Sequence, residues 1–474
     1  MLPEPEVCQR ARISRDPRFD GCFYVGVLTT GIYCRPICPA RLPREDNVRY
    51  FPSSASAQVA GFRPCMRCRP ETARRLPEWT LGSQTVVRGM RLIDSGYLDN
   101  HRVDDLAGRL GVSTRHLNRL FHQELAASPK NLARVRRLQL ARRLIDESTL
   151  PFSQVAMLAG YGSVRRFNVE LREAYGRSPG ELRRNGGAAA ADRISLCLPL
   201  RAPYHVDWIY DFLARRSLPG VEEVRGRTWL RALQDNGERA GWLEVQVTAE
   251  GLRLTLPATA VAQLGDLIAR VRRVFDLDAD PGAVETVLSG DQMLARQIQR
   301  DPGLRVPGAW DGFETAVRAV LGQQVSVARA RNLAVALCER YGGGSFPGPE
   351  ALVEADVAAI GMPGRRGEAI RTLARLVLDG GLVLDDGADS LVMREALTRV
   401  AGIGPWTAGY IGMRVAKDPD AFPDADWVVL KVLEAKAAAA RRRAEAWRPW
   451  RAYAVMVLWR IEAGRRAAAA RRRS

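Results

Sequence analysis

The sequence lacks the long apolar segments that a membrane protein needs. No run reaches the roughly 18 apolar residues of a bilayer span. The first ten residues, MLPEPEVCQR, carry acids and prolines where a secretory signal has a basic and then an apolar stretch. Hydrophobic residues make up 46% of the chain and charged residues 26%. We therefore expect a folded protein of the reducing cytoplasm, without a membrane partner and without disulfides.

Acidic residues are also in deficit. The 474 residues contain 71 Lys plus Arg against 53 Asp plus Glu, a net charge of +18, and the pI is near 10.1. Positive charge is densest in residues 82–185, with 18 basic and 10 acidic residues. This excess favours a polyanionic partner, with phosphate contacts in the middle block. A basic bias of the proteome or a solubility surface is the alternative.

The composition changes along the chain in a way that indicates several domains, and the length alone predicts about three. Residues 1–81 are rich in Cys, Pro, Gly and Arg, and residues 82–185 have the spacing of amphipathic helices. The run GGAAAA at 186–191 reads as a linker. Alternating apolar residues between 194 and 256 predict a small antiparallel sheet, and helical spacing returns from about 261. The basic tail, residues 465–474, reads as a fraying helix end or a loose arm.

Four cysteines form two closely spaced pairs, Cys34 with Cys38 and Cys65 with Cys68. Two such pairs from two turns supply the four thiolates of a tetrahedral zinc site, so we expect one Zn²⁺ here. The remaining cysteines have no such partners and are interpreted as buried or incidental: Cys8, Cys22, Cys197 and Cys338.

The segments TTGIYCRPIC at 29–38 and GFRPCMRC at 61–68 resemble the zinc domain of Ada-type DNA methylation-response proteins. The resemblance implies that Cys34 is both a zinc ligand and the acceptor of a methyl group from a DNA methyl phosphotriester. A zinc-held thiolate is a competent nucleophile. Its methylation would remove a negative charge and so weaken repulsion from phosphate. A zinc knot without chemistry is the alternative.

Two helix-turn-helix units are predicted in the middle block, at 103–121 and 152–167. Gly111 makes the turn of the first unit and Ser113 caps its second helix. A long basic helix around 135–145 should join the two units. With GRSP at 176–179, the block resembles the AraC-type DNA-binding domain.

The first turn of each second helix offers side chains that can reach base edges in a major groove. The DNA-binding candidates are Arg115, His116, Arg119, Arg165 and Arg166. A helical bundle whose arginines face solvent is the alternative. An activator of this type implies an operator in double-stranded DNA and RNA polymerase as a further partner.

The C-terminal half contains a Gly-x-Gly turn, Gly402 and Gly404, between two apolar segments. Such a turn lets backbone N–H groups approach a phosphate. Together with FPDADW at 422–427, VLGQQVSV at 320–327 and WRPWRAY at 447–453, it resembles the AlkA-type 3-methyladenine glycosylases of the helix-hairpin-helix superfamily. The resemblance covers residues 192–465.

Hydrolysis of an N-glycosidic bond develops positive charge on the sugar, which a fixed carboxylate stabilises. The position in the motif identifies Asp426 as that acid. Asp424, two residues earlier, is expected to cap a helix or to face solvent. An alkylated base is already cationic, so aromatic rings would select it by cation–π attraction.

The resemblance implies further site residues, and the sequence argues against two other kinds of chemistry. The aromatic pocket maps onto Trp406, Tyr410 and Trp459, although each ring could equally pack in the core. Gln324 is the expected wedge that fills the gap left by a flipped nucleotide. Strand-nicking relatives have a lysine where Trp406 stands, so we expect a monofunctional enzyme. With only Cys197 and Cys338 in this half, a four-cysteine iron–sulfur cluster is excluded.

The expected fold is multidomain and mainly α with α+β parts. It comprises a small zinc domain (1–81), a tandem helix-turn-helix domain (82–185), a small antiparallel β-sheet domain (192–300) and a helix-hairpin-helix glycosylase domain (301–470). The expected function is an alkylation-damage sensor and transcriptional activator fused to a glycosylase. No Pro-Cys-His-Arg run occurs, so reversal at guanine O6 is not expected. The alternatives are a regulator whose glycosylase-like half only binds DNA, and an enzyme that its first two domains tether to DNA.

Overall fold

The computed structural model describes residues 2–73, 82–148, 150–183, 193–235, 238–385 and 387–471. The chain packs into two compact units, one of residues 1–200 and 240–269 and the other of residues 201–239 and 270–474. Each unit has its own hydrophobic core. The predicted linker at 186–191 lies outside the described residues.

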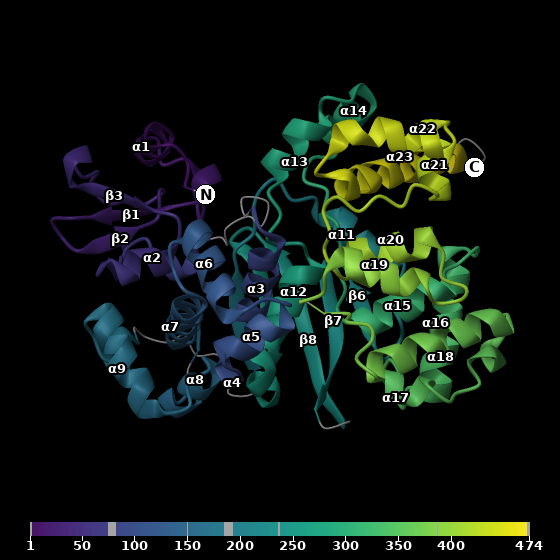
Figure 1. Cartoon of the computed structure of the whole chain (residues 1–474), viewed down its shortest axis with the longest axis horizontal. Helices are drawn as coiled ribbons and strands as arrows, with labels where there is room; N and C mark the ends of the chain where they lie inside the picture. The colour runs from purple at the N-terminus through teal and green to yellow at the C-terminus, as the bar shows by residue number, and fades with distance from the viewer. Residues whose placement is uncertain are drawn as a thin grey trace. The chain divides into compact units, whose positions relative to one another are not determined.

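The first unit begins with a four-stranded sheet of order β3-β1-β2-β4, of which Figure 1 labels β3, β1 and β2. Its elements are α1 (Pro5–Ile13), β1 (Tyr24–Val27), β2 (Ile32–Cys34), β3 (Val48–Phe51), α2 (Ser54–Val59) and β4 (Arg63–Pro64), with 3₁₀ turns at Pro17–Phe19, Glu45–Asn47 and Pro70–Thr72. β2 and β4 run parallel, with Tyr33 opposite Pro64. This register brings Cys34, the last residue of β2, beside Cys65, the first residue after β4.

The described residues of the first unit then form the helices α3 (Gln84–Ser95), α4 (Tyr97–Asn100), α5 (Val103–Arg109), α6 (Thr114–Leu125), α7 (Pro129–Glu147), α8 (Phe152–Leu158), α9 (Val164–Tyr175) and α10 (Pro179–Leu182). The pairs α5–α6 and α8–α9 are the two predicted helix-turn-helix units. Gly111 and Gly160, both with positive φ (72° and 87°), make their turns. The joining helix α7 is longer than predicted.

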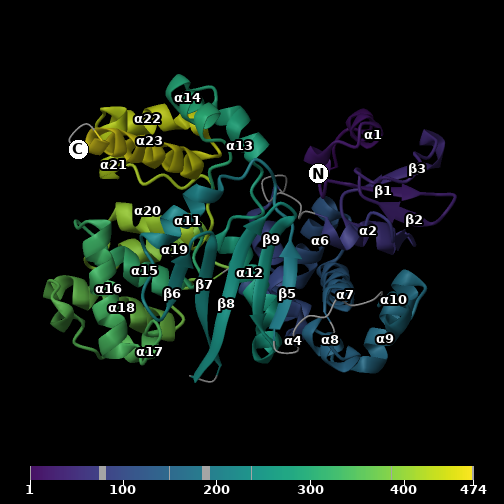
Figure 2. The same ribbon diagram turned by 180° about the vertical axis from the view of Figure 1, so that it is seen from behind.

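An antiparallel sheet has the order β5-β9-β8-β7-β6, and Figure 2 shows β5, β9 and β8 side by side. Its strands are β5 (Arg193–Leu198), β6 (Glu222–Arg225), β7 (Thr228–Asp235), β8 (Glu238–Thr248) and β9 (Gly251–Pro257). The predicted alternation is present, because Leu243 and Val245 are buried while Gln246 is exposed. β8 and β9 pair in register, with Val245 opposite Leu254.

The second unit is otherwise helical. Its helices are α11 (Val206–Ala214), α13 (Pro281–Leu288), α14 (Gln292–Arg300), α15 (Gly312–Leu321), α16 (Val327–Tyr341), α17 (Pro349–Leu352), α18 (Gly364–Leu378), α19 (Ser390–Thr398), α20 (Pro405–Arg414), α21 (Trp427–Leu433), α22 (Ala437–Ala444) and α23 (Arg451–Arg471). α12 (Leu264–Val274) follows a 3₁₀ turn at Ala258–Gln263, and further 3₁₀ turns lie at Val357–Ile360 and Glu445–Trp447.

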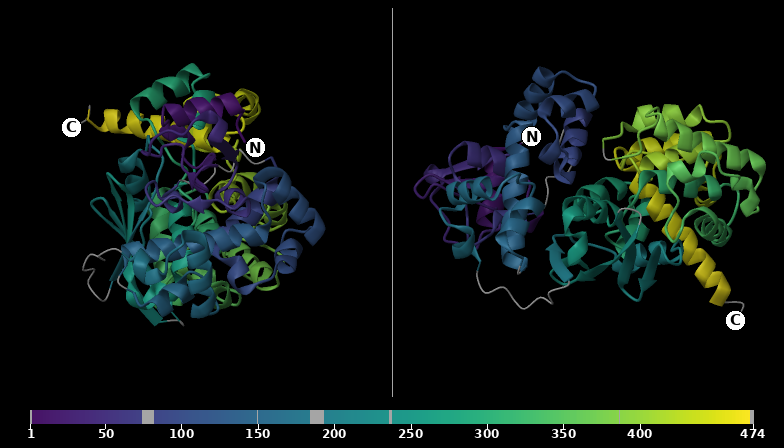
Figure 3. Two further views of the ribbon diagram at one scale, coloured as in Figure 1. Left: turned by 90° about the vertical axis from the view of Figure 1, so that its left-hand side faces the viewer. Right: turned by 90° about the horizontal axis from the view of Figure 1, so that it is seen from below.

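One core joins α15, α16, α18, α19 and α20 of the second unit. The helix α23, yellow and ending at the C mark in Figure 3, continues through most of the basic tail. Within the described ranges, no helix combines the length and apolarity needed to cross a bilayer.

Candidate functional site

A pocket of about 960 Å³ lies in the second unit. It is formed by α11, the loop between α15 and α16, the turn before α20, the start of α21, and α23. Its lining contains all the residues that were predicted from the glycosylase resemblance: Gln324, Gly402, Gly404, Trp406, Tyr410, Asp426 and Trp459. The fold therefore gathers side chains that are more than 130 positions apart in the sequence.

Asp426 is buried at this pocket, with 6% of its surface exposed. Its Oδ2 accepts a hydrogen bond from Trp406 Nε1 at 2.9 Å, and its Oδ1 accepts one from Trp459 Nε1 at 3.1 Å. Oδ1 also accepts from the backbone N–H of Val429 at 3.0 Å, which makes Asp426 the N-cap of α21. The acid is thus held in a fixed orientation at the pocket wall.

Of the two expectations for Asp424, a helix cap or a solvent-facing side chain, the cap is wrong, because α21 begins one residue after Asp426 and takes its cap from that side chain. Asp424 instead forms an ion pair of 3.2 Å with Arg441, and its side chain is 22% exposed. Asp424 does not line the pocket.

The three predicted rings form a row along the pocket. The centroids of Trp406 and Tyr410 are 5.8 Å apart with planes at 17°, and those of Tyr410 and Trp459 are 6.4 Å apart at 29°. All three residues are partly exposed rather than enclosed in the core. A row of nearly parallel aromatic faces is suited to stacking on a planar base.

The Gly-x-Gly turn joins α19 to α20. Gly402 has a φ of 93°, a conformation that L side chains rarely adopt. Gly404 is the N-cap residue of α20, Pro405 is its first residue, and a Cβ at Gly404 would meet nothing within 4 Å. The N-terminus of α20 is therefore open to an incoming anion.

The loop between α15 and α16 approaches this turn. The Gln323 side-chain amide donates to Gly402 O at 2.9 Å and to Thr407 Oγ1 at 3.0 Å, so it braces the hairpin. Gln324 is exposed and has a φ of 54°, a strained value for a residue with a side chain. This loop presents Gln324 at the pocket rim.

Tyr410 stands among positive charges. Its Oη accepts a 2.6 Å hydrogen bond from Arg414 Nη1. Burial would raise the pKa of the Tyr410 phenol, but Arg414, Arg216 and Arg318 outweigh burial and lower that pKa. Burial lowers the pKa of the Arg216 guanidinium to about 10.

The sequence reasoning missed several residues of the pocket lining, among them Phe212, Arg216, Arg414 and Glu462. Helical spacing could have revealed two of them. Arg414 lies four residues after Tyr410 and Glu462 three after Trp459, which places each on the same helix face as its aromatic partner. No local signal links Phe212 and Arg216 to the site, because α11 is distant in sequence.

The four paired cysteines meet in the first unit, where their Sγ atoms all lie within 4.8 Å of one another. Four zinc–sulfur bonds of ~2.3 Å in a tetrahedron require sulfur separations of about 3.8 Å, so the cluster fits a zinc ion. Among the described residues, no other group of three or more His, Cys, Asp or Glu side chains has this proximity. Cys8 and Cys338 are buried elsewhere, as expected.

Cys34 differs from its partners in exposure. It is partly exposed, whereas Cys38, Cys65 and Cys68 are buried. The backbone N–H of Arg35 donates to Cys68 Sγ at 3.4 Å, and the Arg35 guanidinium donates to Cys68 O and pairs with Asp20. Cys34 is therefore the one member of the cluster whose residue is partly exposed.

In the first helix-turn-helix unit, Ser113 caps α6 as predicted, since its Oγ accepts from the His116 N–H at 3.3 Å. Arg115 and Arg119 are exposed and His116 is partly exposed. Arg119 Nη2 lies 3.0 Å from His116 Nδ1. The three predicted side chains thus occupy the outer face at the start of α6.

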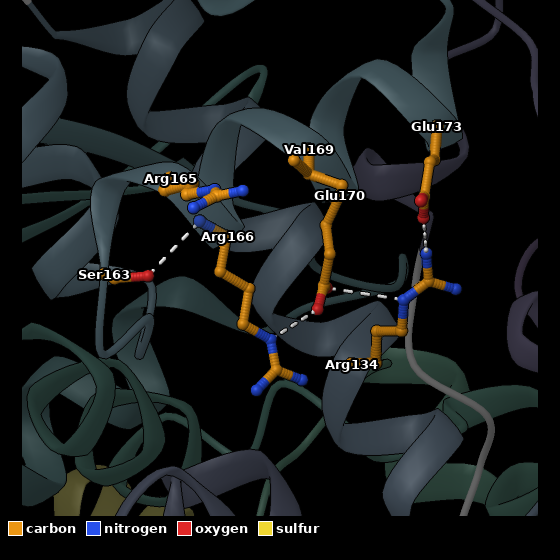
Figure 4. Close-up of a pocket in the computed structure, with 7 residues that line it drawn as sticks. All are labelled: Arg134, Ser163, Arg165, Arg166, Val169, Glu170 and Glu173. Carbon is orange, nitrogen blue, oxygen red and sulfur yellow. Dashed lines mark hydrogen bonds and ion pairs between the residues drawn. The ribbon is translucent and has the colours of Figure 1, made fainter.

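In the second unit, Ser163 caps α9, and Arg165 and Arg166 are exposed (Figure 4). Arg166 Nε pairs with Glu170 at 2.9 Å, and Arg134 of α7 pairs with Glu170 and Glu173. Figure 4 shows Arg165 outside this chain of ion pairs. Of the two predicted arginines, Arg165 is the one whose charge is not already balanced by a carboxylate within the described residues.

Family models match three parts of the chain. Residues 7–71 match the metal binding domain of Ada, residues 106–185 a helix-turn-helix domain, and residues 195–311 the AlkA N-terminal domain. With the cysteine cluster, they define a DNA-binding protein of DNA repair and transcription that binds zinc through its Ada-type domain.

Similarity to known relatives identifies the family within this class of DNA-binding proteins. A probable bifunctional transcriptional activator/DNA repair enzyme AlkA of Mycobacterium tuberculosis is 41% identical, over 96% of each chain. DNA-3-methyladenine glycosylase 2 of Escherichia coli is 35% identical, over 55% of this chain and 95% of its own. The bifunctional transcriptional activator/DNA repair enzyme AdaA of Bacillus subtilis is 26% identical, over 37% and 80%. The chain belongs to the family of bifunctional transcriptional activator/DNA repair enzymes of the AlkA type.

Proposed function

We propose that the C-terminal half is a monofunctional DNA glycosylase that hydrolyses the N-glycosidic bond of 3-methyladenine and other alkylated bases, with Asp426 as its catalytic carboxylate. The observation that carries this proposal is the burial of Asp426 at the pocket wall between two indole N–H donors. A carboxylate oriented before the reaction can stabilise the positive charge that develops on the sugar without a reorganisation cost. It can also orient the water that attacks the anomeric carbon.

The pocket supports an extrahelical base as the substrate. Its volume of about 960 Å³ suits a nucleotide. The row of Trp406, Tyr410 and Trp459 offers electron-rich faces to a cationic alkylated base. When the base is extrahelical, Gln324 fills the gap that it leaves in the duplex. Gly402 and Gly404 bring backbone N–H groups to a phosphate.

The proposed reaction ends at an abasic site. A strand-nicking glycosylase forms a Schiff base between a lysine and the sugar. None of the described residues that line this pocket is a lysine. An indole stands at position 406, and its N–H is engaged with Asp426.

We further propose that Cys34 accepts a methyl group from a DNA methyl phosphotriester. The sulfur attacks the methyl carbon, the carbon–oxygen bond breaks, and the phosphate leaves as a negatively charged diester. Cys34, Cys38, Cys65 and Cys68 would hold the zinc ion, which supplies acidity that keeps the sulfur deprotonated at neutral pH. The partial exposure of Cys34 among three buried ligands supports its choice.

The tandem helix-turn-helix units would read an operator through Arg115, His116, Arg119, Arg165 and Arg166. Loss of one negative charge at Cys34 would weaken repulsion from DNA and raise affinity for that operator. As an activator, the protein would then act on RNA polymerase. We propose the domain boundaries 1–81, 82–185, 192–300 and 301–470 for this organisation.

One experiment tests the repair half. Methylated duplex is incubated with wild type, Asp426→Asn or Asp424→Asn, and free 3-methyladenine is measured under single-turnover conditions. We expect Asp426→Asn to slow release at least ~100-fold, in line with the loss of one preorganised electrostatic group. Asp424→Asn is the matched control and should release base within a few-fold of wild type.

Equal release by wild type and Asp426→Asn would refute the assignment of the acid. Absence of release by wild type would favour the rival reading, a regulator with a non-catalytic DNA-binding module. Mass analysis of the Cys34 peptide after exposure to phosphotriester DNA tests the sensor half. A Cys34 thiol that stays unmodified would favour the alternative in which the first two domains only tether the enzyme to DNA. In that case Cys34→Ser should retain full function if it folds.

A further inference from the structure

The last two turns of α7 contact two parts of the first unit that are far apart in the sequence. They carry two ion pairs with i, i+4 spacing, Arg142 with Asp146 at 2.6 Å and Arg143 with Glu147 at 3.6 Å. Neighbouring residues of an α-helix are rotated by about 100° around its axis, so the two pairs lie on different faces. One pair meets the zinc domain, and the other meets the strand β5.

The first pair holds the segment that follows the cysteine cluster. Arg69, the residue after Cys68, pairs with Asp146, and Arg69 Nε lies 3.4 Å from Glu71 Oε1. Arg142 Nε lies 3.9 Å from the same Glu71 oxygen, and these two side chains are 5% and 3% exposed. Removal of one partner from a buried network of charges is strongly destabilising. The zinc domain is therefore fastened to the end of α7.

The backbone of Arg69 supports the same contact. Its φ of 52° lies in the left-handed region, which residues with a side chain seldom adopt. Such a conformation persists only where the surrounding contacts hold it. The Arg35 Nη1 group donates to Cys68 O at 3.1 Å and to Thr72 Oγ1 at 2.9 Å, on either side of Arg69. The turn that leads from the cysteine cluster to α7 is thus fixed at both ends.

The second pair covers the edge of a sheet. β5 comes first in the order β5-β9-β8-β7-β6, so one of its edges has no strand partner among the described residues. On that edge the Cys197 N–H donates to Glu147 Oε2 at 3.2 Å, and Arg143 Nη2 donates to Cys197 O at 2.6 Å. An open strand edge can pair with another chain. Side chains of α7 here occupy the backbone groups that such pairing would use.

These contacts join segments that match different families. α7 lies within residues 106–185, which match the helix-turn-helix domain, whereas Cys197 lies within residues 195–311, which match the AlkA N-terminal domain. Gly265 of the same match also lies against α7, because a Cβ at Gly265 would be 2.7 Å from Arg136 Nη2. The regulator segment therefore contacts the first domain of the repair half at two places along one helix.

We propose that the last turn of α7 is a junction that couples the zinc domain to the edge of the β5 sheet, so that release of either partner loosens the other. In the docked state Asp146 holds Arg69 while Glu147 holds the Cys197 N–H. In the released state the last turn of α7 frays, and both contacts are lost together because the two acids are consecutive. Such a coupling is reciprocal by thermodynamic necessity.

The junction gives the two halves of the chain a physical connection. A two-state element whose equilibrium is biased from both sides is what coupling between two sites requires. A change in the zinc domain, such as the proposed methyl transfer, would thereby reach the first strand of the repair half. The inference concerns contacts within the fold, so its test is independent of both proposed activities.

The test compares Asp146→Ala with Glu147→Ala by amide hydrogen exchange in the full chain. These neighbours lose the same kind of group and gain a residue that favours helix, but one faces the zinc domain and the other faces β5. We expect each variant to speed exchange in both residues 65–72 and residues 193–198. The increase should be about 10-fold or more, as for the loss of a hydrogen bond to a charged group.

Two further variants complete the test. Glu173→Ala is the matched control, because it removes a carboxylate of α9 that pairs at 3.2 Å with Arg134, nearer the start of α7. It should leave exchange in both segments at the wild-type rate. Arg69→Gln weakens the junction from outside α7 and should speed exchange in β5, which Arg69 does not contact.

Three results would overturn the proposal. If each alanine variant speeds exchange only at its own partner, both contacts exist but are not coupled. If Glu147→Ala leaves residues 193–198 at the wild-type rate, the contact with the sheet edge is itself refuted. If Arg69→Gln leaves β5 unchanged, the coupling fails even where an alanine variant does not fold.

Discussion

Trp406 donates its indole N–H to Asp426 Oδ2 at 2.9 Å, and this is the single protein donor to that oxygen among the described residues. Oδ1, by contrast, has two donors, Trp459 Nε1 and the Val429 N–H. The two carboxylate oxygens are therefore held unequally. The tryptophans of the pocket therefore hold the carboxylate as well as lining the pocket.

Trp406→Phe removes the N–H and keeps an aromatic ring. A hydrogen bond to a charged group is worth about 1.5–3 kcal/mol, so we expect the single-turnover rate at saturating DNA to fall about 10- to 100-fold. Trp459→Phe is the matched control and should cost less, because Oδ1 keeps the Val429 N–H. Equal losses in both variants would contradict the unequal support of the two oxygens.

The two glycines of the hairpin should respond differently to alanine. Gly402 has a φ of 93°, where a Cβ costs about 1–2 kcal/mol. Gly402→Ala should therefore lower the free energy of unfolding by that amount. Gly404→Ala should leave stability nearly unchanged, since its φ is −88° and a Cβ there meets no neighbour. Chemical denaturation gives both values.

The variants Gly402→Ala and Gly404→Ala also test the proposed contact between the hairpin and a DNA phosphate. If the backbone at Gly404 approaches DNA closely, Gly404→Ala should weaken binding to an abasic-site duplex although the protein is fully stable. Binding equal to wild type would place the phosphate elsewhere.

Removal of zinc should unfold the N-terminal part of the chain. The four-sulfur cluster joins the ends of β2 and β4 in a region with only small clusters of core residues. Metal binding at such sites supplies folding free energy. A chelator should therefore abolish hydrogen-exchange protection in residues 24–64 and leave α15 to α20 protected. Cys8→Ser is the control for loss of a buried cysteine outside the cluster, and retained protection after complete zinc removal would contradict the prediction.

Arg165 and Arg166 should contribute unequally to operator binding. Arg166 pairs with Glu170, whereas Arg165 forms no ion pair in the described part of the chain. Arg165→Gln should weaken DNA binding and reduce the slope of log K against log salt by about 1 if it meets a phosphate. Arg166→Gln should change both quantities less. The reverse order would mean that Glu170 releases Arg166 when DNA binds.

Local patterns in the sequence were sufficient for much of this architecture. The spacing of Cys34, Cys38, Cys65 and Cys68 predicted their convergence, because each pair lies within one turn. Ser113 was identified as a helix cap because capping depends on only three following residues. The alternation of apolar and polar side chains along β8 and β9 likewise follows a local rule, since each strand has one buried and one outward face.

The other features of the site depend on the packing of segments that are distant in sequence, so local patterns could not predict them. Nothing in the local sequence places Arg216 of the segment after α11 beside Tyr410 of α20. The confusion of Asp424 with a cap arose because both acids precede α21 closely, and only the backbone shows that the helix begins at Trp427. The resemblance indicated the tryptophans, but their N–H bonds to Asp426 depend on side-chain orientation.

Asp426 caps the first turn of α21 and also faces the pocket, so one side chain serves both the helix and the pocket. Loss of the side chain altogether would remove an N-cap worth about 1 kcal/mol along with the acid. Asparagine caps a helix as well as aspartate does but carries no charge. A homologue that has lost repair activity and keeps its fold is therefore expected to have asparagine rather than alanine at this position. The residue at position 426 would then distinguish a folded but inactive protein from a destabilised one.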